Sequence, residues 1–130
     1  MGQEKIKIGQ LGESLARRYL ENHGYIVLAK NIRTKKGELD LICQKNQLVV
    51  FVEVKTRRSK TYGLAEEAIT HKKALTLAKI TQDYLMKNLL ENRRFRIDLI
   101  VVELDNQSNK VKIRHVENAI SDLDDQSLDD

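Results

Sequence analysis

The segment from Leu48 to Arg57 constrains the fold of this chain most. Its first five residues are apolar strand formers, and Glu53 and Lys55 interrupt the apolar run toward its end. A run that is apolar on both faces is typical of a strand in the middle of a sheet, with other elements packed on each side. Charged side chains are rarely buried without partners. The acid and the lysine at the end of this strand therefore require an explanation.

The preceding segment predicts a partner strand for this run. Residues 39–44 read as a strand, and the three-residue break at residues 45–47 suits an antiparallel return. Side chains on a strand alternate between faces, so Glu53 and Lys55 point the same way, and Glu38 and Asp40 share a face of the first arm. In the register that the turn implies, Asp40 comes near Glu53 and Lys55.

The remaining chain supplies two amphipathic helices and three further strands. A helix is expected from about Ile6 to His23, with Leu11 on its apolar face and Glu13 at the border of that face. A second helix is expected over residues 65–90, and the strands over residues 25–33, 96–104 and 110–116. The apolar side of the second helix is expected to carry Ala68, Leu75, Ala78, Leu85 and Leu89. The order α-β-β-β-α-β-β predicts an α/β fold with a mixed central sheet flanked by helices.

The distribution of charge divides the chain into a basic body and an acidic end. Residues 1–120 are expected to form a single domain, and residues 121–130 a disordered tail with five aspartates and no lysine or arginine. The net charge of the whole chain is +4, and without those ten residues it is +9. A body this basic suits a polyanion such as nucleic acid.

Two features of the composition bear on where the protein works. No segment is long and apolar enough to cross a membrane, so no membrane partner is expected. Cys43 is the single cysteine and cannot form an intramolecular disulfide, and no leader pattern indicates export. A cytoplasmic location is therefore expected.

The carboxylates of Asp40 and Glu53 predict metal chemistry at the end of the hairpin. Two carboxylates that are brought together repel each other, and a divalent cation resolves that conflict. Oxygen ligands from Asp40 and Glu53, joined by the carbonyl of Val54, suit Mg²⁺ or Mn²⁺ rather than zinc. Such an ion polarises a phosphodiester, while Lys55 orients a water molecule or stabilises the developing charge. The pattern therefore indicates metal-dependent phosphodiester hydrolysis.

The sequence resembles a known family in three places. These are residues 9–18 (GQLGESLARR), residues 37–40 (GELD) and residues 51–57 (FVEVKTR). They resemble the YraN-like bacterial family of the restriction-endonuclease-like PD-(D/E)xK superfamily, which is distantly similar to archaeal Holliday junction resolvases. The resemblance extends over roughly residues 8–120, and it implies a restriction-endonuclease-like core.

Site residues follow from this resemblance position by position. It implies that Asp40 and Glu53 are metal ligands, that Lys55 is the catalytic lysine, and that Glu13 is the glutamate that resolvase-like members add from a helix. Leu39 stands where the superfamily name has proline. The implied activity is that of a nuclease acting on branched, structured or single-stranded DNA, and resolvase-like relatives often act as homodimers.

Alternative interpretations stand beside these. Glu38 ranks last among the candidate metal ligands, because it fits a turn position equally well. A phosphate track of Arg57, Arg58, Lys60, Lys72 and Lys73 is weighed against ordinary surface charge. Structural roles are expected for the histidines and for Cys43, and Asp98 is expected to be structural or paired with an arginine. A catalytically silent nucleic-acid-binding module and a protein-interaction adaptor are the alternative functions.

Overall fold

The computed structural model describes residues 2–58, 69–90, 92–105 and 107–120. In chain order the elements are α1 (Gly2–Asn22), β1 (Ile26–Thr34), β2 (Gly37–Lys45), β3 (Leu48–Arg57), α2 (His71–Lys87), β4 (Phe95–Leu104) and β5 (Val111–Val116). This order confirms the predicted α/β fold class. Lys60 and the acidic segment 121–130 lie outside the described residues.

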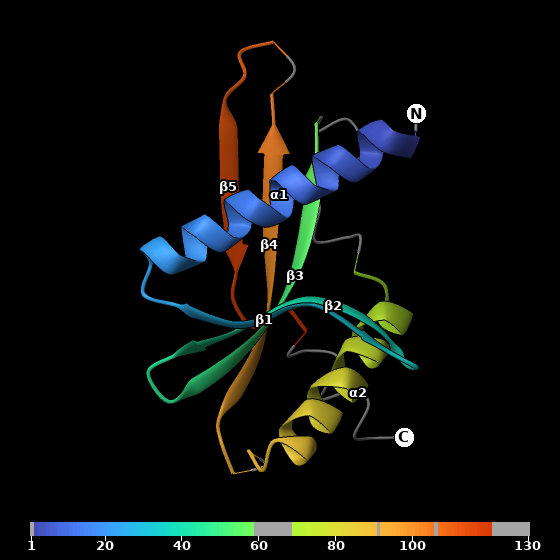
Figure 1. Cartoon of the computed structure of the whole chain (residues 1–130), viewed down its shortest axis with the longest axis vertical. Helices are drawn as coiled ribbons and strands as arrows, with labels where there is room; N and C mark the ends of the chain where they lie inside the picture. Colours follow the sequence, from blue (N-terminus) through green and yellow to red (C-terminus); the bar gives the residue numbers. More distant parts are fainter. Residues whose placement is uncertain (1, 59–68, 91, 106, 121–130) are drawn as a thin grey trace.

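The strand β3 is the middle strand of a five-stranded sheet with the order β1-β2-β3-β4-β5 (Figure 1). It pairs antiparallel with β2 and parallel with β4, and the outer pairs β1·β2 and β4·β5 are antiparallel. The sheet is therefore mixed, as expected. Residues Val49 to Val52 are almost completely buried, because a helix covers each face of the sheet.

Each helix packs on its own face of the sheet (Figure 1). The core beneath α1 contains Ala16 and Leu20 of the helix together with side chains of the sheet such as Leu41, Val50 and Val52. The core beneath α2 contains helix residues and the opposite side chains of the same strands, among them Leu39, Phe51, Ala74, Leu77 and Ile80. Alternate residues of β3 thus face different helices.

The predicted apolar faces of the helices are wrong at several positions. Leu75 is 36% exposed and Leu89 is 84% exposed, whereas Ala74 and Leu77 are buried. The helix α2 begins after its N-cap residue Thr70, and its rotation about its axis is set by packing on the sheet. Leu11 of α1 is also 49% exposed. No helix among the described residues is long and apolar enough to span a membrane.

A buried carboxylate ties β4 to β5 on the face of the sheet that α1 covers. Asp98 is fully buried and accepts hydrogen bonds from Arg96 at 2.7 and 2.8 Å and from the backbone N–H of Asn118 at 3.0 Å. His115 Nε2 lies 2.7 Å from its Oδ2 atom, and Arg96 also donates to the Tyr25 hydroxyl at 2.7 Å. Asp98 therefore has the structural role and the arginine partner that were expected of it.

Candidate active site

The candidate site lies where β2 and β3 separate. Their backbone ladder extends from the pair Lys45–Leu48 to the pair Leu41–Val52, and the same register places Asp40 across from Glu53. At this position the carboxylate of Asp40 accepts a hydrogen bond of 2.7 Å from the N–H group of Val54. The side chain therefore satisfies a backbone donor that the ladder leaves open. This contact fixes one oxygen of Asp40 at the end of the hairpin.

The carboxylate of Glu53 is largely buried on the α2 side of the sheet. Its side chain is 15% exposed, and Lys73 Nζ lies 3.1 Å from its Oε2 atom. That approach lacks hydrogen-bond geometry, so Oε2 is a buried oxygen without a hydrogen-bond donor among the described residues. Burial raises the pKa of Glu53 to about 8, and the hydrogen bond and charge of Asp40 act in the same direction, against Lys73.

A third carboxylate reaches Asp40 from α1. Burial raises the pKa of Glu13, and the charge of Asp40 and a hydrogen bond with Asp40 raise this pKa further. The positive charge of Lys30 acts in the opposite direction. Asp40 therefore neighbours two other carboxylates, that of Glu53 on β3 and that of Glu13 on α1. Within the described part of the chain, no three histidine, cysteine or carboxylate side chains form a metal cluster. Glu13, which the resemblance implied as an addition to the metal site, lies beside Asp40 in the structure, outside any three-residue cluster among the described residues.

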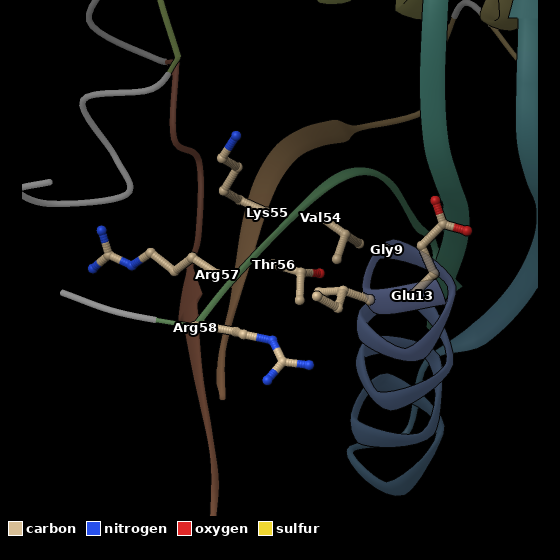
Figure 2. Close-up of a pocket in the computed structure, with 8 residues that line it drawn as sticks. Gly9, Glu13, Val54, Lys55, Thr56, Arg57 and Arg58 are labelled. Carbon is tan, nitrogen blue, oxygen red and sulfur yellow. The ribbon is translucent and has the colours of Figure 1, made fainter. Parts of the chain in front are cut away.

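Lys55 is exposed and lies two residues after Glu53 on β3. Alternation along the strand places it on the same face as Glu53, as the sequence predicted. Figure 2 shows its side chain extending away from Glu13 and from α1. The ammonium of Lys55 is therefore accessible to a molecule that approaches the α2 side of the site.

An open cleft of about 470 Å³ lies between residues 8–13 of α1 and the end of β3. Figure 2 shows Val54, Thr56 and Arg58 directed toward the α1 side, with Glu13 on the helix across from them. A smaller cleft of about 190 Å³ lies on the other side of Glu13 and is lined in part by Arg17 and Lys30. Glu13 therefore lines two clefts, each of which also has basic residues.

The other candidate residues have different surroundings. Glu38 is exposed and forms an ion pair of 3.5 Å with Arg33, so the structure does not bring it to the carboxylates. Arg57 forms a largely buried ion pair of 3.5 Å with Glu103 on β4. Lys72 is exposed in the first turn of α2. Of the predicted phosphate track, Arg58 and Lys72 have exposed side chains among the described residues.

Gly12 is a packing position next to the site that the sequence interpretation did not single out. It is buried, and a Cβ atom built at Gly12 would overlap the side chain of Thr56. The close approach of α1 to the end of β3 therefore depends on the missing side chain. Because Glu13 follows directly, this contact also sets how near Glu13 comes to Asp40. The glycine was visible in the sequence, but its contact with Thr56 was not.

Replacing Gly12 by alanine is expected to lower the free energy of unfolding by about 1–3 kcal/mol, because the added methyl group overpacks the contact with Thr56. Gly9→Ala is the matched control in the same helix, since a Cβ atom there meets no atom within 4 Å. That control is expected to be neutral or stabilising by up to about 1 kcal/mol. Urea unfolding of both variants measures the difference, and equal effects would contradict the close contact.

The carboxylate pair fits a hard divalent cation. Asp40 and Glu53 offer oxygen atoms, which Mg²⁺ and Mn²⁺ prefer, and Oε2 of Glu53 is buried without a hydrogen-bond donor among the described residues. A pKa raised by burial and by a neighbouring carboxylate also marks a pair whose charge is incompletely compensated. Asp40 and Glu53 would therefore hold the ion, with Glu13 beside Asp40.

Comparison with known sequences gives consistent matches over most of the chain. The pattern of the uncharacterised protein family UPF0102 matches residues 12–102. A UPF0102 protein of Alkaliphilus oremlandii is 43% identical over 113 residues, which are 87% of this chain and 97% of the relative. A UPF0102 protein of Clostridium botulinum is 41% identical over 86% of this chain and 92% of the relative. A UPF0102 protein of Clostridium beijerinckii is 38% identical over 86% of this chain and 91% of the relative.

Comparison with solved structures gives a more distant similarity. SfsA of Pyrococcus furiosus, solved in complex with Ca²⁺, aligns with 87% of this chain and with 63% of its own chain. The two are 15% identical, and the TM-score is 0.43. This similarity is too low to place individual residues in correspondence.

Proposed function

The chain belongs to the uncharacterised protein family UPF0102, and from its carboxylate pair we propose that it is a metal-dependent nuclease that hydrolyses phosphodiester bonds in structured or branched DNA. The observation that carries this proposal is the pairing of Asp40 with a buried Glu53 whose Oε2 atom has no hydrogen-bond donor among the described residues. A basic body and open clefts with cationic walls support a polyanionic substrate.

Each residue has a distinct part in the proposed reaction. Asp40 and Glu53 would hold Mg²⁺ or Mn²⁺, which when bound would polarise the phosphodiester as a Lewis acid and acidify water. Asp40 is oriented for this by the N–H group of Val54. Lys55 donates to an oxygen of the scissile phosphate or orients the attacking water, because its ammonium is exposed on the face that Glu53 occupies. Arg58 and Lys72 bind flanking phosphates without reading bases.

Cleavage assays with variants of β2 test the proposal. Branched, flapped and single-stranded DNA are incubated with the protein and Mn²⁺ or Mg²⁺, and cleavage is expected to disappear when EDTA removes the ion. Asp40→Asn is expected to lower the cleavage rate at least about 100-fold, since it removes one charge from the metal ligands. Glu38→Gln is the matched control on the same strand, because Glu38 is exposed and paired with Arg33.

Thermal unfolding gives a second readout that does not depend on turnover. A cation that binds only the folded state stabilises it by about 2.7 kcal/mol at 100 times the dissociation constant, so Mn²⁺ should raise the melting temperature. Asp40→Asn should remove that increase, and Glu38→Gln should keep it. DNA binding without cleavage under all metals would indicate the binding module, and absence of DNA binding would leave the adaptor.

A further inference from the structure

Lys73 lies against Glu53, one of the two candidate metal ligands. Its ammonium is 3.1 Å from Oε2 of Glu53, and the two side chains are 39% and 15% exposed. In this ion pair the Glu53 side chain is therefore more shielded from solvent than the Lys73 side chain. Lys73 was predicted to belong to a phosphate track, and in the structure its ammonium pairs with Glu53.

The position of Lys73 in α2 makes this partner important. Lys73 is in the first turn of the helix, which begins after the N-cap residue Thr70 and has no acidic residue in that turn. The helix dipole disfavours a cation there. The ammonium is therefore held by Glu53 and not by its own helix. It also supplies positive charge beside two carboxylates that otherwise repel each other.

We propose that the ammonium of Lys73 and a divalent cation compete for the Glu53 carboxylate, and that Lys73, once displaced by the ion, binds a phosphate group of the nucleic acid. This inference rests on the proposed function, which supplies both the ion and the polyanion. Oε2 of Glu53 is buried and lies 3.1 Å from the Lys73 ammonium, so an ion that binds this oxygen takes the place of the ammonium. Lys73 therefore links the two binding events in this scheme.

The displaced lysine has a direct thermodynamic consequence. If the ion frees a cation that then contacts DNA, the ion strengthens DNA binding and DNA strengthens ion binding by the same factor. An ordinary surface lysine that contacts phosphate lacks this coupling, because its contribution to DNA affinity is the same with and without the ion. Lys72 is the neighbouring exposed lysine in the same turn and provides that comparison.

The first experiment measures ion affinity alone. Mg²⁺ is titrated into wild type, Lys73→Met, Lys73→Arg and Lys72→Met by calorimetry at one fixed alkaline pH. Lys73→Met is expected to bind Mg²⁺ about fivefold more tightly than wild type, because the competing cation is gone. Lys73→Arg should restore the wild-type value, and Lys72→Met should remain near it. Equal or weaker Mg²⁺ binding by Lys73→Met would overturn the competition.

The second experiment measures coupling to DNA in a Lys55→Ala background, which prevents cleavage during the measurement. Mg²⁺ is expected to strengthen binding of branched DNA, and Lys73→Met should reduce this gain about fivefold. Lys72→Met should weaken binding equally with Mg²⁺ and with EDTA. An undiminished gain in Lys73→Met overturns the inference while leaving the nuclease proposal in place. Absence of DNA binding in every variant overturns both, and the calorimetry then reports on the ion site alone.

Discussion

Glu53→Gln is expected to make the protein more stable and far less active. Burial and the neighbouring Asp40 raise the pKa of Glu53 from 4.5 to about 8, so the folded state holds this proton more tightly than the unfolded state. The contribution of Glu53 to stability is then complete below about pH 4.5 and is lost as the pH rises through about 8. Glutamine keeps the shape of the side chain without titrating.

The gain from Glu53→Gln should therefore grow with pH. In the absence of divalent metal, the free energy of unfolding of the variant relative to wild type should increase between pH 5 and pH 8.5 by on the order of 3–4 kcal/mol, since one unit of pKa corresponds to about 1.4 kcal/mol. Urea unfolding at both pH values measures this difference. Glu38→Gln serves as the control, because that side chain is exposed on β2. Parallel pH dependences of wild type and Glu53→Gln would refute the coupled carboxylate pair.

The same substitution should remove activity. The amide of glutamine carries no charge, so the ion loses one of its two anionic ligands. Cleavage is expected to fall by at least about 10³-fold at saturating DNA, and added Mn²⁺ should no longer raise the melting temperature. A variant that is more stable but inactive separates loss of function from loss of fold. Retained cleavage would exclude Glu53 from the reaction.

Asp98→Ala is expected to cause a large loss of stability. Burial raises the pKa of Asp98, but the contacts from His115, Arg96 and the N–H group of Asn118 outweigh it and hold the pKa below its ordinary value. Removing the carboxylate leaves Arg96, which is 19% exposed, without its principal partner. Loss of one member of a buried ion pair costs about 3–5 kcal/mol, a large fraction of a typical stability of about 5–15 kcal/mol.

Chemical denaturation and the pH dependence of stability test this role. Asp98→Asn should lose less than Asp98→Ala, since the amide oxygen still accepts a hydrogen bond. Because the folded-state pKa of Asp98 is lowered, the wild-type contribution is present above about pH 4 and is lost as the pH falls through the folded pKa. Asp83→Ala, at an exposed ion pair with Lys36, should change stability little. Equal losses in Asp98→Ala and Asp83→Ala would contradict the network.

Local patterns in the sequence were sufficient to predict the middle strand of the sheet and the approach of Asp40 to Glu53. The apolar run at residues 49–52 predicted a middle strand, and the short break after residue 44 predicted an antiparallel return that brings Asp40 near Glu53. The expected three-residue turn was wrong by one residue: Lys45 pairs with Leu48, so the turn is residues 46–47, and this register places Asp40 across from Glu53. Both inferences depend on residues close together in the chain, where alternation and turn length limit the geometry. They therefore needed no knowledge of how the helices pack.

Helix orientation could not be obtained in the same way. The apolar residues of α2 are spread widely enough around the helix to favour more than one face, and packing on the sheet buried Ala74 and Leu77 in place of Leu75. Periodicity gives the presence of a helix, but its rotation is decided by how side chains of the sheet fit against it. The position of Lys73 follows from that rotation.

The sequence by itself determined the order of the elements, the central position of β3 and the meeting of Asp40 with Glu53. The tertiary structure alone decided that Lys73 reaches Glu53 from α2, and that Gly12 lets α1 approach Thr56. The physical reason is the range of the interactions. Backbone alternation acts between near neighbours, whereas these contacts require helices on opposite faces of the sheet to settle into one packed arrangement.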